Sequence, residues 1–496
     1  MTSLWLDRER DYATDQFVPD ADFDDVVVGA GLTGLVTALL LARSGRRVAV
    51  LEARQVGAVT TGNTTGKLSL LQGTVLSTIL KHNAREVGHA YVEGNREGLA
   101  WLLHYCEHHD IGVQRRDAFT YANTPAGNAT VRHEVDAGRQ LGLDVTYVED
   151  LELPFPTYGA ARLVDQAQFD PMEVLTSLVS DLRQHGGVVF EGTRVLDVVT
   201  GRPDRIITAA GELRAEHVIL ATGTPILDRG LYFAKLSSLR SYGLAFRVPG
   251  PIPQGMYLSA DSPSRSLRTA PRADEQLLVV GGNGHIVGRE PSPQHQVDDL
   301  TRWTQTHFPD AERTHVWSAQ DYQSHNLIPF VGKLPRGGGH VYLATGYNKW
   351  GMTNAVAAAL RISAEILGGH LPWALVLGRR ITHPSSIAKG LQAGAAIGVQ
   401  TVRGWAASEL NPLSAADRAP AEGQGVVGRQ GVKPVAVSTV HGQTCAVSAV
   451  CPHLGGVLRW NDAELSWDCP LHGSRFDSDG ILLEGPATAD LEVYDA

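Results

Sequence analysis

The sequence is poor in cysteine and has no long apolar run. Four cysteines in 496 residues are too few and too scattered for a disulfide framework, which favours a reducing, cytoplasmic compartment. The most apolar stretches, 26–41 and 355–367, contain Gly, Thr, Asn or charge and are shorter than the roughly 20 residues of a membrane span. The acidic N-terminus, residues 1–25, lacks the apolar core of a signal peptide. We therefore expect no membrane span and a cytoplasmic location.

The chain also lacks an excess of positive charge. Its net charge of -10 argues against nucleic acid or an anionic membrane as a general partner. A hydrophobic content of 43% and a charged content of 19% are those of an ordinary globular protein. A chain of this length has room for two or three domains with substantial cores.

Two Cys–His pairs near the C-terminus form a set of soft metal ligands. One residue separates Cys451 from His453, and two separate Cys469 from His472. Thiolates favour zinc, copper(I) or iron–sulfur centres, and a Rieske [2Fe-2S] cluster takes two thiolates on one iron and two imidazoles on the other. A structural zinc site usually has two Cys two to four residues apart, which is not the pattern here. We predict a [2Fe-2S] cluster rather than a zinc knuckle or four unrelated residues.

The residues around these pairs resemble the two cluster-binding loops of Rieske domains. The loops read Cys-Pro-His-Leu-Gly-Gly from Cys451 and Cys-Pro-Leu-His-Gly-Ser-Arg-Phe from Cys469. The resemblance implies that both histidines face solvent, where an electron-transfer partner docks. Respiratory members of the family carry a disulfide across the loops and a Ser and a Tyr that hydrogen-bond the cluster sulfurs. The corresponding positions are Gly456, Leu471, Ser474 and Phe476, so we expect a potential between the respiratory and ferredoxin-like kinds.

A glycine-rich turn near the N-terminus has the context of a dinucleotide-binding site. An apolar strand leads into it, a helix follows, and a second strand, 48–51, ends at an acidic residue. Gly29 permits the tight turn, Gly31 lets the backbone approach a pyrophosphate, and Gly34 allows close helix–strand packing. The predicted nucleotide contacts are Gly29, Gly31, Leu32, Thr33, Gly34, Glu52, Ala53 and Arg54, with Glu52 accepting from the ribose hydroxyls.

Two later segments favour FAD over NAD. A strand that begins at Val195 and another that ends in Ala221, Thr222 and Gly223 resemble the second adenosine-side contact of glutathione-reductase-type flavoproteins. The segment 341–354 resembles the part of those proteins that closes over the flavin ring, where a helix N-terminus can stabilise negative charge. An ordinary glycine-rich loop would leave these matches unexplained. The predicted contacts in the second segment are Gly346, Asn348, Gly351, Met352, Thr353 and Asn354.

Residues 5–368 resemble the D-amino-acid oxidase and glycine oxidase class of flavoproteins, and the whole chain resembles a subgroup with a C-terminal Rieske domain. Beyond the fingerprint, the resemblance rests on residues 60–67, 168–171 and 346–354. It implies that the Thr/Gly run packs along the flavin; the alternative is a polar surface loop. The predicted contacts in that run are Thr61, Thr64, Thr65, Gly66 and Lys67.

This resemblance implies an α/β FAD-binding domain of the glutathione-reductase-type Rossmann fold, an inserted and mainly antiparallel β substrate domain, and a small all-β Rieske domain. We expect the FAD-binding domain in three pieces, 1–85, 160–235 and 325–395. Residues 236–324 alternate apolar and polar residues, as strands do. The substrate domain is expected over 86–159 and 236–324, and the Rieske domain over 425–496. Between them we expect a helix over 386–410 and a connector over 396–424.

Candidate substrate contacts lie on the expected strands of the substrate domain and close to the flavin motifs. Arg suits bidentate recognition of a carboxylate, although aromatic residues on strands are more often packing residues and a lone His is more often structural. The candidates are Arg240, Tyr242, Tyr257, His285, Lys67, Asn348 and Trp350. Hydride transfer needs chiefly orientation, so no catalytic acid or base is expected.

The resemblance implies oxidation of a C–N bond in a small amine or amino-acid-like substrate by hydride transfer to FAD. Our leading hypothesis is that the electrons then leave singly through the [2Fe-2S] cluster to an external acceptor. A second hypothesis reverses the flow, from an external donor through the cluster to a reductive or oxygenating flavin. A third is an electron-transfer or redox-sensing module without catalysis.

Overall fold

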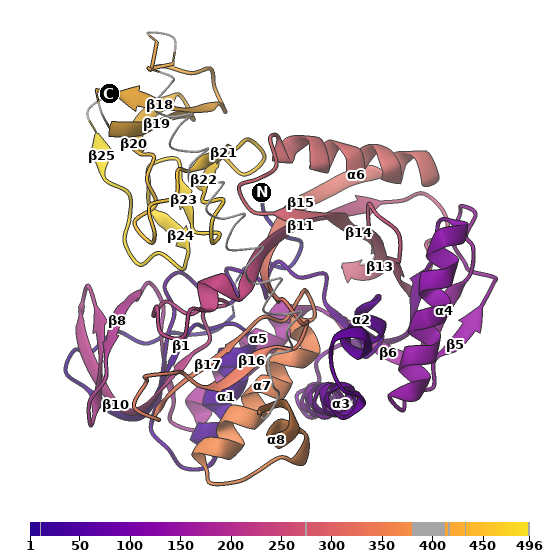
Figure 1. Cartoon of the computed structure of the whole chain (residues 1–496), viewed down its shortest axis with the longest axis horizontal. Helices are drawn as coiled ribbons and strands as arrows, with labels where there is room; N and C mark the ends of the chain where they lie inside the picture. The colour runs from indigo at the N-terminus through magenta and orange to yellow at the C-terminus, as the bar shows by residue number, and fades with distance from the viewer. Residues whose placement is uncertain (10, 273–274, 379–411, 415–416, 432, 495–496) are drawn as a thin grey trace.

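The computed structural model describes residues 1–9, 11–272, 275–378, 412–414, 417–431 and 433–494. They form an eight-stranded sheet, a nine-stranded sheet and two four-stranded sheets (Figure 1). The helix expected over 386–410 and most of the connector fall outside these ranges. Within them, no helix combines the length and apolar character that crossing a membrane requires.

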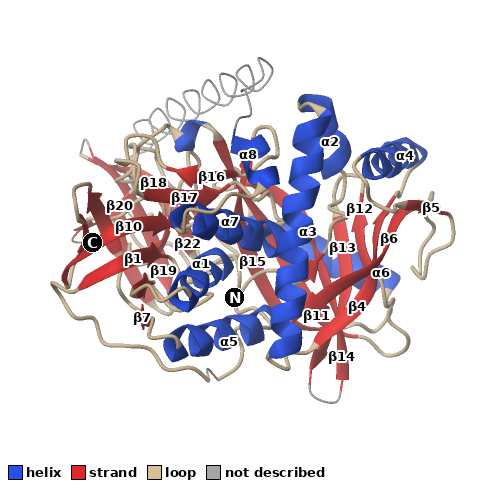
Figure 2. Ribbon diagram, turned by 90° about the horizontal axis from the view of Figure 1, so that it is seen from below, coloured by secondary structure: helices blue, strands red, loops and turns tan. Residues whose placement is uncertain are grey.

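The eight-stranded sheet is mostly parallel, in the order β16–β17–β10–β1–β2–β7, with β8 and β9 at its side. Residues 26–28 of β1 and all of β2 are continuous apolar runs, as expected for strands buried on both faces. Helices α1 (Leu32–Arg43), α5 (Pro171–Gln184) and α7 (Gly351–Ile366) pack together against it (Figure 2). The strands are β1 Asp22–Val28, β2 Val48–Leu51, β7 Val188–Phe190, β8 Val195–Val199, β9 Asp204–Thr208, β10 Gly211–Leu220, β16 Phe330–Lys333 and β17 Val341–Thr345.

The nine-stranded sheet runs β15–β11–β14–β13–β12–β4–β6–β3, with β5 paired to β6, and is antiparallel except between β12 and β4. Four helices accompany it: α2 (Val75–His82), α3 (Arg85–His108), α4 (Pro125–Gln140) and α6 (Pro293–His307). The strands are β3 Lys67–Leu68, β4 Val113–Tyr121, β5 Thr146–Val148, β6 Ala160–Phe169, β11 Leu236–Arg247, β12 Met256–Ser259, β13 Arg265–Arg272, β14 Glu275–Ile286 and β15 Glu312–Ser324.

Two details of this sheet differ from the pattern read in the sequence. Strands β3 and β6, which fall in the expected FAD-binding pieces 1–85 and 160–235, pair in the nine-stranded sheet instead. Helix α6 interrupts the stretch 236–324, for which the sequence pattern suggests sheet. Its buried residues Val297, Leu300 and Thr304 are spaced three and four apart, which is a helical period.

The C-terminal β domain, residues 425–494, consists of the two four-stranded sheets and confirms the expected small all-β fold. Trp467 and Phe476 lie at the centre of its core. The first sheet contains β18 Gly425–Gln430, β19 Lys433–Val440, β20 Gln443–Ser448 and β25 Val493–Tyr494; the second contains β21 Arg459–Asn461, β22 Ser466–Asp468, β23 Arg475–Asp477 and β24 Leu482–Glu484.

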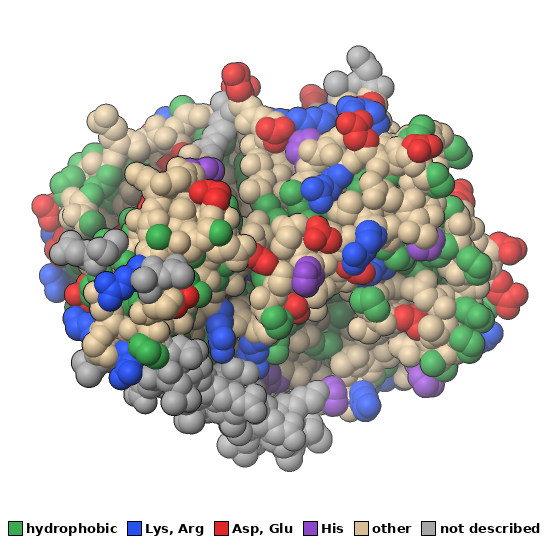
Figure 3. Space-filling model, turned by 90° about the horizontal axis from the view of Figure 1, so that it is seen from above, with side chains coloured by type: hydrophobic (Ala, Val, Ile, Leu, Met, Phe, Trp, Pro, Cys, Tyr) green, Lys and Arg blue, Asp and Glu red, His purple; other side chains and the backbone are tan. Residues whose placement is uncertain are grey.

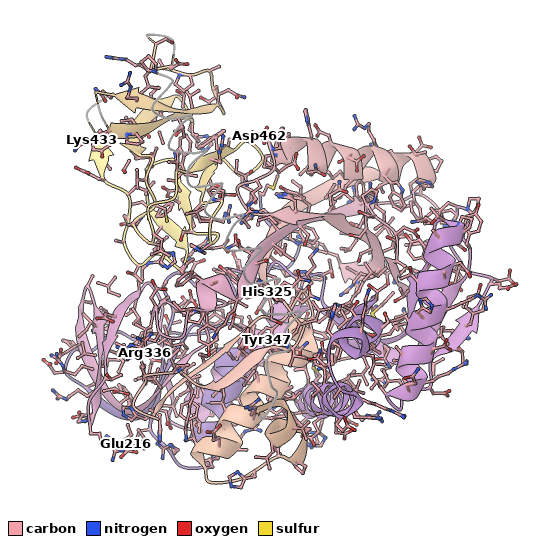
Figure 4. All side chains as sticks on the ribbon, in the orientation of Figure 1. Glu216, His325, Arg336, Tyr347, Lys433 and Asp462 are labelled. Carbon is pink, nitrogen blue, oxygen red and sulfur yellow. The ribbon has the colours of Figure 1, made fainter. Side chains whose placement is uncertain are left out.

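This domain is packed on the rest of the molecule. Asp462 accepts hydrogen bonds from the Ser292 hydroxyl (2.6 Å) and the Gln294 amide (2.9 Å), so it caps the first turn of α6 (Figure 4). On the opposite side, the Arg194 guanidinium donates to the Leu482 carbonyl at 2.7 Å. The domain therefore contacts both large sheets. On the face shown in Figure 3, acidic and basic side chains are interspersed.

Candidate functional site

A cavity opens at the carboxyl ends of the parallel strands, where ligands of α/β sheets usually bind. Its empty volume is about 1450 Å³, counted to its open mouth. Val28 ends β1, Leu51 ends β2 and Ala221 follows β10, and all three line the cavity. The strand order thus brings together motifs that are far apart in the sequence.

The turn from β1 to α1 has no room for side chains at two of its glycines. Gly29 has a φ of +107°, and a Cβ there would lie 2.6 Å from the Ala221 carbonyl oxygen. A Cβ at Gly34 would lie 1.9 Å from the Gly29 carbonyl oxygen. The close approach allows α1 to begin at Leu32, with Gly31, Leu32 and Thr33 lining the cavity. A helix N-terminus in this position suits a pyrophosphate.

Glu52 is held at the end of β2 by the backbone. One carboxylate oxygen accepts the Ala30 amide at 2.9 Å, and the other accepts the Arg54 amide at 2.9 Å. Burial raises the pKa of Glu52, and these hydrogen bonds oppose the rise. Each oxygen keeps a further lone pair that can accept a ribose hydroxyl. The carboxylate therefore fits the role predicted for it.

Most of the predicted cofactor residues line this one cavity. The Thr61 hydroxyl also accepts the Leu32 amide at 3.2 Å, which joins the Thr/Gly run to the start of α1. The predicted residues that line the cavity are Gly29, Gly31, Leu32, Thr33, Glu52, Ala53, Arg54, Thr61, Thr64, Val195, Ala221, Thr222, Gly223, Gly346, Gly351 and Met352.

The remaining predicted cofactor residues surround the cavity without lining it: Gly34, Thr65, Gly66, Lys67, Asn348, Thr353 and Asn354. The Lys67 ammonium donates to the Tyr257 carbonyl (2.7 Å) and the Ser266 hydroxyl (2.5 Å), and burial lowers its pKa to about 7. Thr353 and Asn354 hydrogen-bond with Asn95 on α3. Thr353 and Asn354 thereby fix the first turn of α7 against α3.

The substrate candidates outside the flavin motifs lie elsewhere in the fold. Arg240 is 1% exposed, and its guanidinium contacts Glu464 of the C-terminal domain at 2.6 Å. The Tyr242 hydroxyl lies 3.1 Å from His285 Nε2, and the Tyr257 ring stacks on Phe119. Arg240 therefore has a carboxylate partner within the chain, and the two tyrosines belong to the core of the nine-stranded sheet.

Asn348 and Trp350, the two candidates from the flavin motif, are also not among the residues that line the cavity. The Asn348 side-chain oxygen accepts from Gln323 at 2.9 Å. Trp350 precedes α7 and packs at the edge of the apolar cluster under α2 and α4. Lys349 stands between them in the sequence and does line the cavity.

The four predicted iron ligands converge at one end of the C-terminal domain. Cys451 and Cys469 are buried and free, and a hydrogen bond from Cys469 lowers the pKa of Cys451 to about 7. The rings of His453 and His472 lie 5.0 Å apart. Among the residues that the structure describes, neither ring nitrogen of buried His472 has a hydrogen-bond partner, which is unusual for a buried polar group unless a metal engages it. The set fits a cluster with two thiolates and two imidazoles.

The expectation that the two histidines face solvent is wrong. The His472 side chain is buried, and the His453 side chain is 9% exposed. Phe233 packs edge-on against both rings, and Asp228 lies 3.4 Å from His453 Nε2. The segment 228–235, which comes from the other part of the molecule, covers the histidine side of the domain.

The positions that distinguish these loops from respiratory ones lie next to the ligands. A Cβ at Gly456 would lie 2.8 Å from the Leu471 side chain, so an apolar contact stands where respiratory loops have a disulfide. The Ser474 hydroxyl hydrogen-bonds Cys451 and accepts the Ala487 amide at 3.0 Å. Phe476 is fully buried in the core.

Comparison with known proteins agrees with both halves of this site. A model of the family "FAD dependent oxidoreductase" matches residues 24–365, and a model of the "Rieske [2Fe-2S] domain" matches residues 411–495. This chain belongs to the FAD-dependent oxidoreductase family. The C-terminal β domain is its Rieske domain. The resemblances read from the sequence are thereby confirmed, and the cofactors are FAD and a [2Fe-2S] cluster.

Similar proteins extend over different parts of this flavoprotein. The Bacillus subtilis (strain 168) protein YhfW, described as a Rieske 2Fe-2S iron-sulfur protein, is 30% identical over 96% of this chain and 94% of its own. Glycine oxidase of Bacillus licheniformis is 22% identical over 70% of this chain and 93% of its own. The crystal structure of glycine oxidase from Geobacillus kaustophilus superposes with a TM-score of 0.62 at 18% identity, over 73% of this chain and 100% of that one. At this low sequence identity, the similarity to the solved structure is evidence about the fold alone.

Sequence reasoning missed two features of the flavoprotein's cavity. Lys349 and Asp321 both line it, and the Asp321 carboxylate accepts the Lys349 amide. Burial lowers the pKa of Lys349 and raises that of Asp321. The signal that could have indicated Lys349 is its place inside the flavin motif, between two residues that were considered.

The second missed feature is that the Rieske domain also lines the cavity. The residues concerned lie at the end of β24 and directly after it: Leu483, Glu484, Gly485, Ala487 and Thr488. No motif in the sequence marks this stretch, since it resembles any loop of a small β domain. We call it the 483–488 segment.

Proposed function

We propose that this enzyme oxidises a C–N bond of a small amine or amino-acid-like substrate at FAD and passes the electrons singly through its Rieske cluster to an external acceptor. When bound, FAD supplies a two-electron hydride acceptor and the cluster a one-electron carrier. The observation that supports the proposal most is the cavity shared by the two domains, because it brings the flavin site beside the cluster domain.

A short series of side chains connects the cavity to a cluster loop. The Tyr322 hydroxyl, at the cavity, donates to the Gly485 carbonyl at 3.3 Å. Gln320 donates from its amide nitrogen to the Tyr322 hydroxyl (2.9 Å) and to the Gly473 carbonyl (2.7 Å). Gly473 follows the ligand His472. These contacts support electron transfer within the docked molecule rather than by a swinging domain.

Lys349 suits a substrate that carries a carboxylate. The Lys349 ammonium occupies the space into which a side chain at Gly284 would project. The Lys349 side chain therefore extends from the flavin cavity toward β14, which contains Gly284. A partly desolvated ammonium attracts a carboxylate more strongly than an exposed one does. We propose Lys349, and not Arg240, as the cation that favours amino acids over simple amines.

Anaerobic reduction with a panel of amines and amino acids tests this function. We expect substrate to bleach the flavin absorbance first and the cluster's EPR signal to appear afterwards. Reduction only by an external reductase or NAD(P)H would support the reverse flow of electrons. Bleaching by dithionite alone would support a module without catalysis. Each of these two results contradicts the proposal.

A further inference from the structure

The Rieske domain forms part of the wall of the flavin cavity. The 483–488 segment forms one side of it, facing Arg194, Val195 and Ile226 from the eight-stranded sheet region. The Arg194 guanidinium donates to the Leu482 carbonyl at 2.7 Å, which anchors the start of the segment to the strand that carries Val195. A dinucleotide in this cavity would therefore touch both domains.

The cluster loop fixes the other end of the same segment. The Ala487 amide donates to the Ser474 hydroxyl at 3.0 Å, and Ser474 also hydrogen-bonds the cluster ligand Cys451. Glu484 contacts Arg475 at 2.6 Å. Ala487 is 3% exposed. The segment is thus a rigid part of the Rieske domain rather than a loose loop that happens to lie near the cavity.

One buried cation from the flavoprotein half, residues 1–378, contacts carboxylates of the Rieske domain. Arg240, on β11, lies 2.6 Å from Glu464, 3.9 Å from Glu484 and 4.0 Å from Asp468. Arg475 is the second cation among these three carboxylates. Removing Arg240 would leave three buried carboxylates with Arg475 as their one remaining cation among the described residues, which is far more costly than losing an exposed ion pair.

We propose that the Rieske domain completes the FAD-binding site. The 483–488 segment forms one wall of that site, and Arg240 is the positioning residue that holds the Rieske domain in place. FAD affinity then depends on the docking of the Rieske domain. Linkage requires the reverse as well: bound FAD stabilises the docked position. The inference concerns FAD binding alone and holds whatever the substrate is.

The decisive variant is Arg240→Met, compared with Arg265→Met as a matched control. Arg265 is also buried, on strand β13 of the same sheet, but its partner Asp299 (2.6 Å) belongs to the same domain. Each protein is purified with its cluster, stripped of FAD and titrated with FAD by flavin fluorescence, without substrate. We expect at least a tenfold weaker FAD affinity for R240M and at most a twofold change for R265M. Arg240→Lys, which keeps the charge, should lose less than R240M.

A second variant acts inside the cavity. Ala487→Leu adds volume to the 483–488 segment, so FAD affinity should fall at least tenfold while the cluster's absorbance and EPR spectra persist. Unchanged FAD affinity in both R240M and A487L would overturn the proposal. If R240M does not fold, A487L decides alone.

Hydrogen exchange gives a readout of the reverse linkage. Amides of residues 462–488 should exchange faster in the natural protein stripped of FAD than in the FAD-loaded protein, by at least threefold. Equal exchange in the two forms would contradict the linkage. Because no substrate is present, a negative result here leaves the proposed reaction unaffected, and a failed reaction leaves this result unaffected.

Discussion

The FAD-binding domain and the Rieske domain hold their redox groups by different physical means. The flavin cradle is made mostly of backbone: Gly29 and Gly34 bring α1 so close to the sheet that its N-terminus faces the cavity. The Rieske domain relies on side chains, with four ligands at one end of a small core. A backbone cradle depends on the extended core behind it, whereas a ligand set brings stability of its own on binding iron.

One buried carboxylate in the flavoprotein half, residues 1–378, and one in the Rieske domain have pKa shifts in opposite directions. Burial raises the pKa of Glu134 on α4 to about 7, although it accepts hydrogen bonds from neutral donors, the backbone amides of Leu76 and Ser77 and the Ser77 hydroxyl. Glu464 in the Rieske domain lies between Arg240 and Arg475, which lower its pKa to about 2 against the effect of burial. Glu464 is therefore a buried carboxylate whose charge is compensated from both sides of the interface between the domains.

The largest expected effect is loss of the cluster. Cys469→Ser removes a thiolate ligand, so the cluster's EPR signal should disappear, and electrons from the flavin should no longer reach a one-electron acceptor. Flavin reduction by substrate should persist when FAD is added in excess. The matched control is Cys106→Ser, a buried thiol on α3, which should keep the full signal. Normal cluster content in the Cys469 variant would show that the ligand set is misassigned.

The second prediction uses pH to separate the two regions. Because the pKa of Glu464 is about 2 in the folded state and ordinarily 4.5, its stabilisation is present above pH 4.5 and is lost as pH falls toward 2. The shift corresponds to about 3 kcal/mol. Glu464→Gln should lower the urea midpoint of the Rieske domain at pH 7, followed by cluster absorbance, and flatten its decline below pH 5. An unchanged midpoint would contradict the role of this carboxylate.

Glu134 should behave in the opposite sense. Its folded pKa of about 7 lies above the ordinary value, so its contribution is fully present below pH 4.5 and is lost as pH rises through 7. In the natural protein, stability of the flavin half, followed by flavin fluorescence, should decline across that window, and Glu134→Gln should remove the decline. If stability followed by flavin fluorescence and stability followed by cluster absorbance changed with pH in the same direction and to the same extent, the opposite roles of Glu134 and Glu464 would be contradicted.

A smaller effect is expected from the cation at the flavin cavity. Lys349→Met should raise KM for amino acids by roughly 10- to 100-fold, because one charge-assisted hydrogen bond contributes about 1.5–3 kcal/mol. KM for amines without a carboxylate should stay within about threefold. Lys333→Met, an exposed lysine paired with Glu365 at 3.2 Å, serves as the control. Equal effects on both substrate classes would argue against recognition of a carboxylate.

The smallest effect concerns the cluster potential. Ser474→Ala removes a hydrogen bond to Cys451, so the reduction midpoint in an EPR titration should fall. One hydrogen bond of about 1 kcal/mol corresponds to roughly 40 mV for a one-electron couple. Ser466→Ala alters a hydroxyl that instead contacts Asp468 (3.0 Å) and should leave the midpoint unchanged. A midpoint that stays constant in the Ser474 variant would remove this argument.

Much of the site could be predicted because its motifs are contiguous. The glycine turn with Glu52, and the loops around Cys451 and Cys469, each carry their chemistry within a few residues. The structure brings the first into one cavity and the second into one set of ligands. The expected division into domains was harder, since β3 and β6 read as strands without revealing which sheet they join.

Arg240 shows why the rest could not be predicted. On a strand beside a flavin, an arginine has the features of a carboxylate-binding residue, and it does bind a carboxylate. That carboxylate is Glu464, which is 224 residues away in the chain. The burial of His453 and His472 under Phe233 has the same origin, because nothing in either loop specifies what covers it.

The sequence by itself determined which cofactors this flavoprotein carries, because backbone conformation at Gly29 and ligand chemistry at Cys451 and Cys469 are local properties. Only the tertiary structure decided how the two cofactor sites are related. In the folded protein the two cluster histidines are covered, Arg240 pairs with a carboxylate of the Rieske domain, and the 483–488 segment lines the flavin cavity. Such contacts depend on the packing of whole domains, and the energy of a buried charge is set by whichever residue that packing places beside it.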